Sequence, residues 1–141
     1  MFSVFVIYMA RQLGCFIQSS FIKAQKMSGI VCTDYLICQD RTDLFRIPLQ
    51  SILYLESQNY IVILHTSTTT HSIRITLKEL ENILITKDFF RIHMSYLVNL
   101  EHITHAGATD IELDNGEHLK ISRNRKAAFQ QALYNFIDKY T

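Results

Sequence analysis

The sequence predicts a mostly β fold with antiparallel sheets, one short helix and a longer helix at the C-terminus. The chain contains only four Gly and one Pro among 141 residues, and it has long stretches rich in Thr, Ile, Leu and Tyr, which favour strands. Several segments alternate apolar and polar residues as a strand does, whereas two change to the period of a helix. A hydrophobic content of 48% with 19% charged residues predicts one folded domain rather than a disordered chain.

The composition also limits the classes of function. The net charge of +1 is far below that of proteins that bind nucleic acid through bulk charge, so any such site must be a local cluster. Cys15, Cys32 and Cys38 are odd in number and form no Cys-x-x-Cys pair, which argues against disulfides and a zinc knuckle and favours the cytoplasm. His102 and His105 have ligand-like spacing, but no helical pattern supports them, so we expect no metal site and no cofactor.

Residues 1–33 are expected to form a separate N-terminal segment, apolar and compatible with a helix. Arg11, Gln12 and Gln18 interrupt it, so its apolar run is far shorter than the ~20 residues of a membrane span. No basic region precedes it and no small-residue cleavage site follows, so a signal peptide is not expected either. Two interpretations stay open: an amphipathic helix that packs against another surface, and a compact domain that starts at Met27. Residues 34–141 are expected to carry the function.

Strand-like runs follow in pairs, and each pair flanks a polar turn, which favours antiparallel hairpins. The first pair is 34–38 and 44–47, around a turn at 40–43, and the second is 52–57 and 60–66, around Gln58 and Asn59. A polar loop at 67–70 leads to another alternating run at 71–75. There Ile73 and Ile75 lie on one side and Arg74 on the other.

The short helix is predicted at residues 76–84. Thr76 and Glu79 can form a capping box, in which each side chain accepts a hydrogen bond from the other residue's backbone N–H. The apolar residues then fall on one helical face: Leu77, Leu80, Ile83 and Leu84. This pattern predicts a structural helix that covers the core of a sheet.

Residues 89–103, FFRIHMSYLVNLEHI, alternate as one strand would. The even positions are all apolar: Phe90, Ile92, Met94, Tyr96, Val98 and Leu100. The other face carries Arg91, His93, Ser95 and Asn99. A hydrolase would use Ser95 as nucleophile and His93 as base, but no Gly-x-Ser-x-Gly elbow surrounds Ser95, and adjacent positions on a strand face align the two poorly. The remaining interpretations are a solvated face and a surface for phosphates and base edges, which such side chains bind.

Residues 110–121, DIELDNGEHLKI, predict a hairpin whose register can be argued. A two-residue turn at Asn115 and Gly116 would mix apolar and polar residues on each face. A three-residue loop at 114–116 instead sets Ile111 opposite Leu119, Glu112 opposite His118 and Asp110 opposite Lys120. Gly116 then occupies the position that needs a left-handed conformation, so we expect the second register.

The C-terminal residues 122–140 have the period of a helix, and Ser122 is the expected N-cap. Its apolar face consists of Phe129, Ala132, Leu133, Phe136, Ile137 and Tyr140. Arg123, Arg125 and Lys126 place three cations where the helix dipole is already positive, which costs stability. A bound phosphate would remove this conflict, because the backbone N–H groups, Ser122 and the cations all suit an anion. The alternative is a solvated helix start.

Five stretches, in order along the chain, resemble the LytTR domain, the DNA-binding output module of many bacterial response regulators. They are IPLQSILYLESQNY (47–60), TLKELE (76–81), FFRIHMSYLVNL (89–100), LDNG (113–116) and ISRNRK (121–126). The resemblance covers about residues 34–126. It implies an elongated antiparallel β fold whose loops and strand ends enter successive major grooves of double-stranded DNA. It further implies a cytoplasmic transcriptional regulator without enzymatic activity or small-molecule substrate, which acts as a homodimer on repeated half-sites.

The resemblance also assigns candidate DNA contacts. The residues that match the family motifs are Arg91, His93, Ser95, Asn99, Arg123, Arg125 and Lys126. Among them, His93 and Arg123 match positions that the family uses on DNA, whereas Asn99 matches a residue that is either a contact or a structural turn residue. The family often adds a contact from the loop before Arg74, so His71 or Arg74 is a further candidate.

Two features depart from the family pattern. Met94 stands where the family usually has a polar residue, often Arg, so it either packs inward or touches a thymine methyl group. Family members commonly carry a receiver domain before the DNA-binding module, and here residues 19–26 resemble the last helix of a receiver. Two rival functions remain: a protein-interaction module that keeps the fold without binding DNA, and a membrane-associated regulator anchored by residues 1–22.

Overall fold

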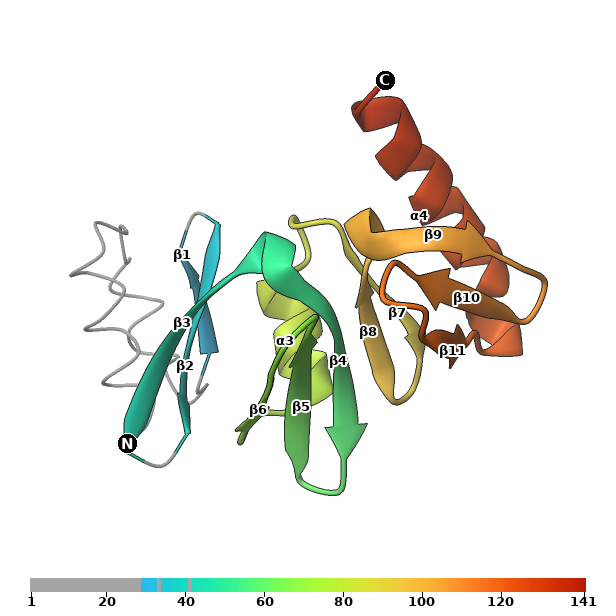
Figure 1. Cartoon of the computed structure of the whole chain (residues 1–141). Coiled ribbons are helices and arrows are strands. Elements are labelled where there is room, and N and C mark those ends of the chain that lie inside the picture. Colours follow the sequence, from blue (N-terminus) through green and yellow to red (C-terminus); the bar gives the residue numbers. More distant parts are fainter. Residues whose placement is uncertain (1–28, 33, 41) are drawn as a thin grey trace.

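Figure 1 shows the computed structural model of the chain, which describes residues 29–32, 34–40 and 42–141. In these residues the strands form three antiparallel sheets that lie side by side in a row, and two α-helices pack against them. The predicted mostly β, elongated fold with one short helix and a C-terminal helix is confirmed. The expectations for residues 1–28 lie outside the described residues, and the domain boundary near residue 33 stays a prediction.

The first sheet contains β1 (Gly29–Cys32), β2 (Tyr35–Asp40) and β3 (Asp43–Pro48), in that order. Strands β2 and β3 coincide with the first predicted pair of runs, and Asp40 pairs with Asp43 across the predicted turn. The buried side chains of Leu36 and Ile47 join this sheet to the core of the next one.

The central sheet has the strand order β6-β5-β4-β8-β7. Its strands are β4 (Ile52–Gln58), β5 (Ile61–Thr66), β6 (Thr70–Ile73), β7 (Phe89–His93) and β8 (Tyr96–Asn99). A short 3-10 helix, η1 (Leu49–Ser51), leads from β3 into β4. Gln58 pairs with Ile61, so the turn consists of Asn59 and Tyr60, one residue later than predicted. Asn59 has a left-handed φ of 55°, which asparagine tolerates better than most residues.

Residues 89–103 do not form the single strand that their alternation predicted. The chain reverses at Met94 and Ser95, so β7 and β8 pair as a hairpin, and η2 (Leu100–His102) follows. Side chains build this turn: the Arg91 guanidinium donates to the carbonyls of His93 and Met94, and the His93 ring accepts from the Ser95 N–H. These bonds take the place of the Gly or Asn that usually marks a tight turn, which explains why no turn residue is recognisable at Met94 and Ser95.

The short helix α3 (Leu77–Ile83) has the predicted capping box. The N–H of Glu79 donates to Thr76 Oγ1 at 3.1 Å, and the N–H of Thr76 donates to Glu79 Oε1 at 3.4 Å. Leu77, Leu80 and Leu84 are buried against the central sheet, so the predicted structural role of this helix is confirmed.

The third sheet has the order β11-β10-β9 and contains β9 (Ile103–Ala106), β10 (Asp110–Leu113) and β11 (His118–Lys120). Ile111 pairs with Leu119, Glu112 with His118 and Asp110 with Lys120, which confirms the predicted register. Gly116 has a φ of 90°, in the region that the predicted loop requires of it.

The C-terminal helix α4 (Lys126–Lys139) follows a short 3-10 helix, η3 (Arg123–Arg125). Ser122 is therefore the N-cap residue of η3 and not of α4, and its side chain makes no capping hydrogen bond. The backbone N–H of Ser122 instead donates to the carbonyl of Ile92 in β7, at 2.8 Å. No helix in the described part of the chain is both long enough and apolar enough to cross a membrane.

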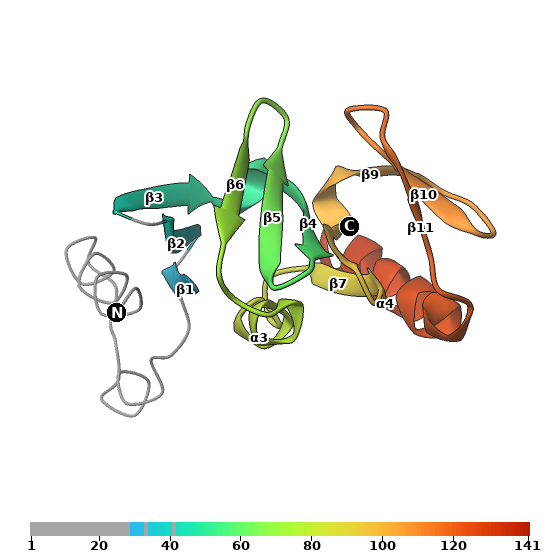
Figure 2. The same ribbon diagram turned by 90° about the horizontal axis from the view of Figure 1, so that it is seen from below.

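Two clusters of buried side chains lie on opposite faces of the central sheet. Neighbouring residues of β8 point to opposite faces, so Leu97 joins the cluster under α3 and the first sheet, and Val98 joins the cluster under α4 and the third sheet. Figure 2 shows α3 and α4 as separate helices beside this sheet. Phe129 of α4 is buried in the second cluster, which fixes the start of α4, and with it η3, next to β7.

Candidate nucleic-acid interface

One end of the central sheet collects two turns. Because neighbouring strands are antiparallel, β4, β6 and β7 finish at this end, and β5 and β8 begin there. We call it the turn end and define it by Asn59, Tyr60, Met94 and Ser95. The backbone N–H of Ser57 donates to the carbonyl of Ser95 at 2.9 Å, so the two turns are fixed relative to each other.

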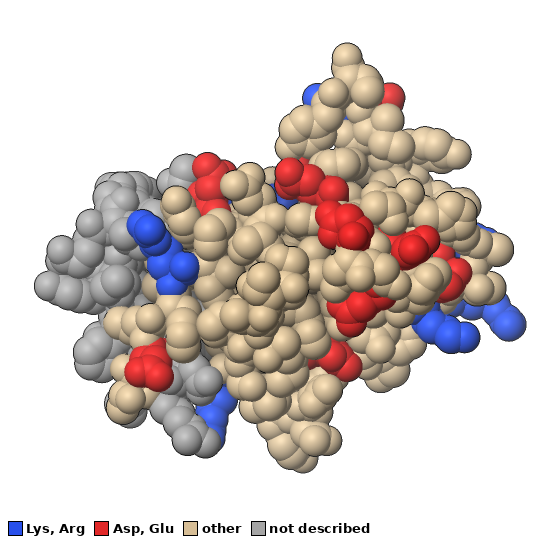
Figure 3. All heavy atoms as spheres, in the orientation of Figure 1, with Lys and Arg blue, Asp and Glu red and all other residues tan. Residues whose placement is uncertain are grey.

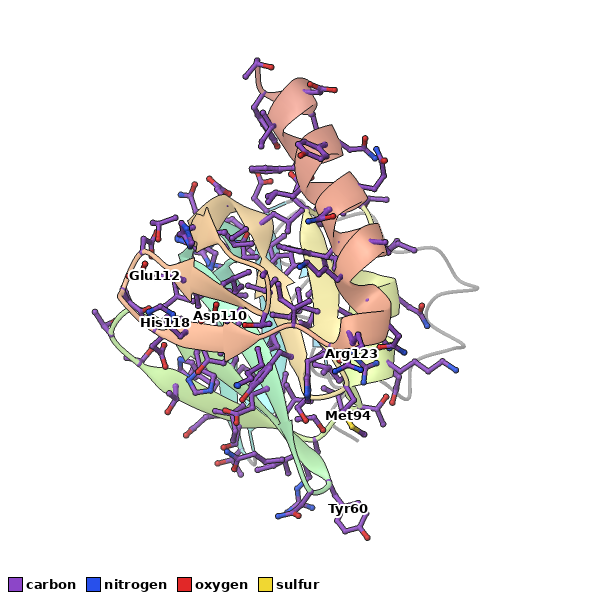
Figure 4. The ribbon with its side chains drawn as sticks, turned by 90° about the vertical axis from the view of Figure 1, so that its right-hand side faces the viewer. Tyr60, Met94, Asp110, Glu112, His118 and Arg123 are labelled. Carbon is purple, nitrogen blue, oxygen red and sulfur yellow. The ribbon has the colours of Figure 1, made fainter. Side chains whose placement is uncertain are left out.

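The basic segment, residues 122–126, lies next to the turn end. The hydrogen bond from Ser122 to Ile92 holds the segment against β7, and Arg125 Nη1 lies 3.5 Å from the Arg91 carbonyl oxygen. In Figure 4 the side chains of Arg123, Met94 and Tyr60 follow one another along one edge of the molecule. The structure therefore brings together two groups of predicted candidates, 91–95 and 123–126, that are far apart in the sequence.

The Arg91 side chain stabilises the β7–β8 turn by hydrogen bonds. Its Nη2 donates to the Met94 carbonyl at 2.6 Å, its Nε donates to the His93 carbonyl at 3.3 Å, and its Nη1 lies 3.4 Å from Glu81 Oε1 of α3. The side chain is half-buried. Arg91 thus positions the turn and ties it to α3, and these bonds engage each of its three nitrogens.

The contacts of His93 define which ring nitrogen carries the proton. The backbone N–H of Ser95 can only donate, and it donates to His93 Nδ1 at 3.1 Å, so the proton of the neutral ring is on Nε2. His93 therefore presents an N–H donor at Nε2, the kind of group that reaches a phosphate or a base acceptor. Because the ring accepts from the backbone of Ser95 and not from its hydroxyl, the pair is not arranged as a nucleophile and base.

Met94 occupies the tip of the β7–β8 turn, and its side chain is 70% exposed. Of the two interpretations of this residue, inward packing is therefore wrong. Its neighbour Ser95 is half-buried and uses its backbone N–H and carbonyl for the turn, which leaves the hydroxyl as its contribution to the surface.

Asn99 has the structural role and not the contact role. Its side chain is only 2% exposed, and its Nδ2 donates to the carbonyls of Leu49 at 3.2 Å and Ile52 at 2.9 Å. Its Oδ1 accepts from the N–H of Glu101 at 3.0 Å. With these bonds inside the core, the amide cannot reach DNA, so the candidate contact at Asn99 is corrected to a residue that joins η1, β4 and η2.

The three cations of the basic segment differ in exposure. Arg123 is exposed and, among the described residues, makes no ion pair, whereas Arg125 and Lys126 are half-buried. No acidic residue lies in the first turn of η3 or α4. The segment therefore carries uncompensated positive charge beside the turn end, which favours a polyanionic ligand.

His71 and Arg74 divide between two places. His71 lies inside β6, where its ring packs on Phe45 of the first sheet at a centroid distance of 4.4 Å, away from the turns. Arg74 is exposed and directly follows the last residue of β6, at the same end of the sheet as Tyr60. Of the two alternatives, position therefore favours Arg74.

Tyr60 was missed as a candidate. It is 96% exposed at the tip of the β4–β5 turn, and it lines a pocket of about 270 Å³ together with Arg91 and Thr76. Strand alternation placed Tyr60 on the same face as Val62 and Leu64, which are buried. The signal that could have found it is the turn itself, because one residue's shift moves Tyr60 out of the strand and into the turn.

Charge on the rest of the surface is uneven. Figure 3 shows acidic side chains gathered over β9, β10 and the neighbouring part of β4, and basic side chains at the edge where β11 leads into α4. The acidic residues of η2, β10 and the β10–β11 turn include Glu101, Glu112, Asp114 and Glu117. DNA would be repelled by the acidic surface, so the turn end and the basic segment form the favoured face.

The third sheet also carries a small cluster around His118 (Figure 4). His118 Nδ1 lies 3.1 Å from Asp110 Oδ2, and Nε2 lies 4.0 Å from Glu112 Oε2. Within the described residues, no three His, Cys, Asp or Glu side chains are arranged to hold a metal ion. The cluster is an exposed cross-strand set of ion pairs, which adds little stability.

Comparison with known proteins gives two matches. The family model of the LytTr DNA-binding domain matches residues 42–134, which include the turn end, the third sheet and the basic segment. Among solved structures, the chain is similar to the LytTr DNA-binding domain of a protein described as a methyl-accepting/DNA response regulator from Bacillus cereus. That match has a TM-score of 0.63 and 24% sequence identity, and it covers 72% of this chain and 97% of the other. No curated protein sequence matches the chain.

Proposed function

The chain belongs to the LytTR DNA-binding domain family, and on that premise we propose that it recognises specific DNA sequences through the turn end and the basic segment. Family membership makes it a DNA-binding output module of transcriptional regulation, without enzymatic activity. The proposal concerns which surface reads the DNA, which residues make the contacts and how many copies bind.

A single observation supports the choice of surface. The hydrogen bond from the Ser122 N–H to the Ile92 carbonyl fastens the basic segment to the strand that carries the β7–β8 turn. Exposed side chains of opposite chemistry, the cation of Arg123 and the apolar Met94, therefore share one edge. An interface that needs phosphate attraction and base readout requires both kinds of group in one place.

The residues take different parts in this interface. Arg123 reads a base edge or a phosphate, and Arg125 and Lys126 attract phosphates at the start of α4. His93, through Nε2, and Ser95, through its hydroxyl, donate from the β7–β8 turn. Arg74 and Tyr60 extend the interface along the turn end. Arg91 and Asn99 do not contact DNA in this proposal. Arg91 holds the β7–β8 turn, and Asn99 joins η1, β4 and η2.

The row of sheets supports binding to successive major grooves, because its elongated shape presents the two turns and the basic segment along one edge (Figure 1). One such module touches few base pairs, so two copies on repeated half-sites would supply the specificity that a genome requires. We propose a homodimer on DNA for this reason, in the cytoplasm, where a regulator meets its promoters.

The test is selection of DNA from a random library by the wild-type chain, followed by affinity measurements at several salt concentrations. We expect a consensus of two spaced half-sites and a steep salt dependence that reflects roughly five to ten phosphate contacts. Arg123→Ala is expected to lose sequence preference. Arg46→Ala is the matched control. Arg46 is exposed on β3, lies over the Tyr35 ring at 4.6 Å, and belongs to the first sheet rather than to the central sheet that carries the turn end.

Two outcomes would contradict the proposal. If the selection enriches no motif and the chain does not bind DNA at low salt, it keeps the family fold as a protein-interaction module. If Arg123→Ala and Arg46→Ala bind the selected site equally well, another surface reads the DNA.

A further inference from the structure

The proposed interface exposes two large apolar side chains to solvent. Tyr60 is 96% exposed and Met94 is 70% exposed, each at the tip of a turn. We infer that these two side chains select thymine in the major groove by contact with its 5-methyl group. The inference rests on the proposed function and adds which base the turn end prefers.

A side chain can select a base only if its backbone is held in place. The carbonyls of His93 and Met94 both accept from Arg91, and the N–H of Ser95 donates to the His93 ring, so the turn that carries Met94 is fixed by side chains on both sides. The bond from Ser57 to Ser95 then fixes the β4–β5 turn relative to it. The two exposed side chains therefore project from turns that are held relative to each other.

Neither side chain has a structural reason to be apolar. Neither belongs to the buried clusters of the described residues or to the partly buried side chains that pack against those clusters. Single exposed apolar residues are common on protein surfaces. Two of them at turns joined by a hydrogen bond, on the edge that also carries the exposed Arg123, form a combination that a protein surface in contact only with water does not need (Figure 4).

The chemistry of the major groove identifies the base. Thymine is the base that presents a methyl group there, whereas cytosine presents an amino donor at the groove and the purines present polar edges. The methionine sulfur is only a weak hydrogen-bond acceptor, so an amino group set against it would lose its water without a comparable replacement partner. The ring of Tyr60 has the same preference, and its hydroxyl can remain in water or reach a phosphate.

The experiment removes single methyl groups from the DNA. In the site selected by the wild-type chain, each thymine is replaced in turn by deoxyuridine, which keeps base pairing and loses only the 5-methyl group. We expect about fourfold weaker binding at one or more positions, the value for one buried methyl-sized group. Met94→Gln is expected to abolish this loss at one position and Tyr60→Ala at another, whereas Met94→Leu and Tyr60→Phe retain it.

The control is Ile85→Ala, because Ile85 is also 72% exposed but lies in the groove beside α4, with Ala132 and Phe136. This variant is expected to respond to every deoxyuridine as the wild type does. If the wild-type chain binds its site with unchanged affinity after every replacement, the inference is wrong and the proposed function stands. If the same penalties persist in Met94→Gln and Tyr60→Ala, other residues read the methyl groups. A wild-type chain that selects no site overturns both proposals.

Discussion

The phenol of Tyr54 donates a hydrogen bond of 3.1 Å to the carboxylate of Glu117 and thereby joins the central sheet to the β10–β11 turn. The ring of His65 stacks on Tyr54 at a centroid distance of 4.2 Å, and His65 Nε2 lies 3.0 Å from Glu56 Oε1. Burial, and then the negative charge of Glu117, raise the pKa of Tyr54 well above its ordinary value. The third sheet, which leads into the basic segment, is therefore tied to the sheet that carries the turns.

The first prediction concerns this tie. Tyr54→Phe keeps the ring and its stacking but removes the hydrogen bond, so we expect a loss of about 1 kcal/mol in the free energy of unfolding, measured with chemical denaturant. Tyr134→Phe is the control, because Tyr134 is exposed on α4 and its hydroxyl makes no such bond across the sheets. Equal stabilities of the two variants would show that the Tyr54 hydroxyl contributes nothing.

The second prediction is the pH dependence of the same bond. Because the folded-state pKa of Tyr54 lies above the ordinary 10.0, folding favours the neutral phenol. That stabilisation is fully present below about pH 10 and is lost as the pH rises toward and through the folded-state pKa. Above about pH 10, we expect the unfolding free energy of the wild type to fall more steeply than that of Tyr54→Phe. Parallel curves for the two proteins would contradict this.

The third prediction concerns the buried amide of Asn99. Asn99→Ala leaves the carbonyls of Leu49 and Ile52 and the N–H of Glu101 without their partner, so we expect a loss of about 2–4 kcal/mol in stability. Asn99→Asp can still accept from Glu101 but cannot donate to either carbonyl, so it is expected to be at least as unstable. Thermal or denaturant unfolding checks this, and an Asp variant as stable as wild type would show that the two donated bonds are unimportant.

The fourth prediction separates positioning from contact. Arg91→Gln loses the bonds that hold the β7–β8 turn, so we expect about tenfold weaker binding to the selected site with an unchanged salt slope, since no phosphate contact is lost. Lys126→Gln is expected to weaken binding to all DNA sequences and to reduce the salt slope by about one. Affinity titrations at several salt concentrations measure both. A slope reduced equally in the two variants would place Arg91 on a phosphate.

The fifth prediction is a gain of binding. Met94→Arg places a cation at the exposed tip of the turn, next to the basic segment, so we expect tighter binding to the cognate site and a salt slope steeper by about one. The preference for thymine at the Met94 position should disappear in the same variant. Unchanged affinity in a binding titration would count against the placement of Met94 in the DNA groove.

Local patterns in the sequence were enough for several elements. The capping box of Thr76 and Glu79 and the loop of Gly116 depend on residues within a few positions of one another, so spacing alone identifies them. The register of β10 and β11 follows from the same kind of information, because a shift of one residue would turn Ile111 and Leu119 out of the core. The basic segment was also visible, since a run of cations needs no structure to be recognised.

The candidate site was only partly predictable. The motifs offered Arg123, His93 and Met94 as candidate contacts, which stays a prediction. They could not separate Arg91 and Asn99 from these candidates, because a motif does not show whether a side chain is exposed or already hydrogen-bonded within the protein. The sequence also placed Tyr60 in a strand, because the alternation of β5 continues through that residue, whereas the pairing of Gln58 with Ile61 puts it in the turn.

The sequence by itself determined the family, the mostly β class, the short helix and the hairpin register, because each depends on local spacing or on the order of motifs. The tertiary structure alone decided that β7 and β8 form a hairpin, that Asn99 serves the core, and that the basic segment meets the turn end. The physical reason is distance along the chain. Asn99 bonds to carbonyls 50 and 47 positions away, and Ser122, which follows the third sheet, bonds to Ile92 of the central sheet, so these relationships exist only once the sheets have packed.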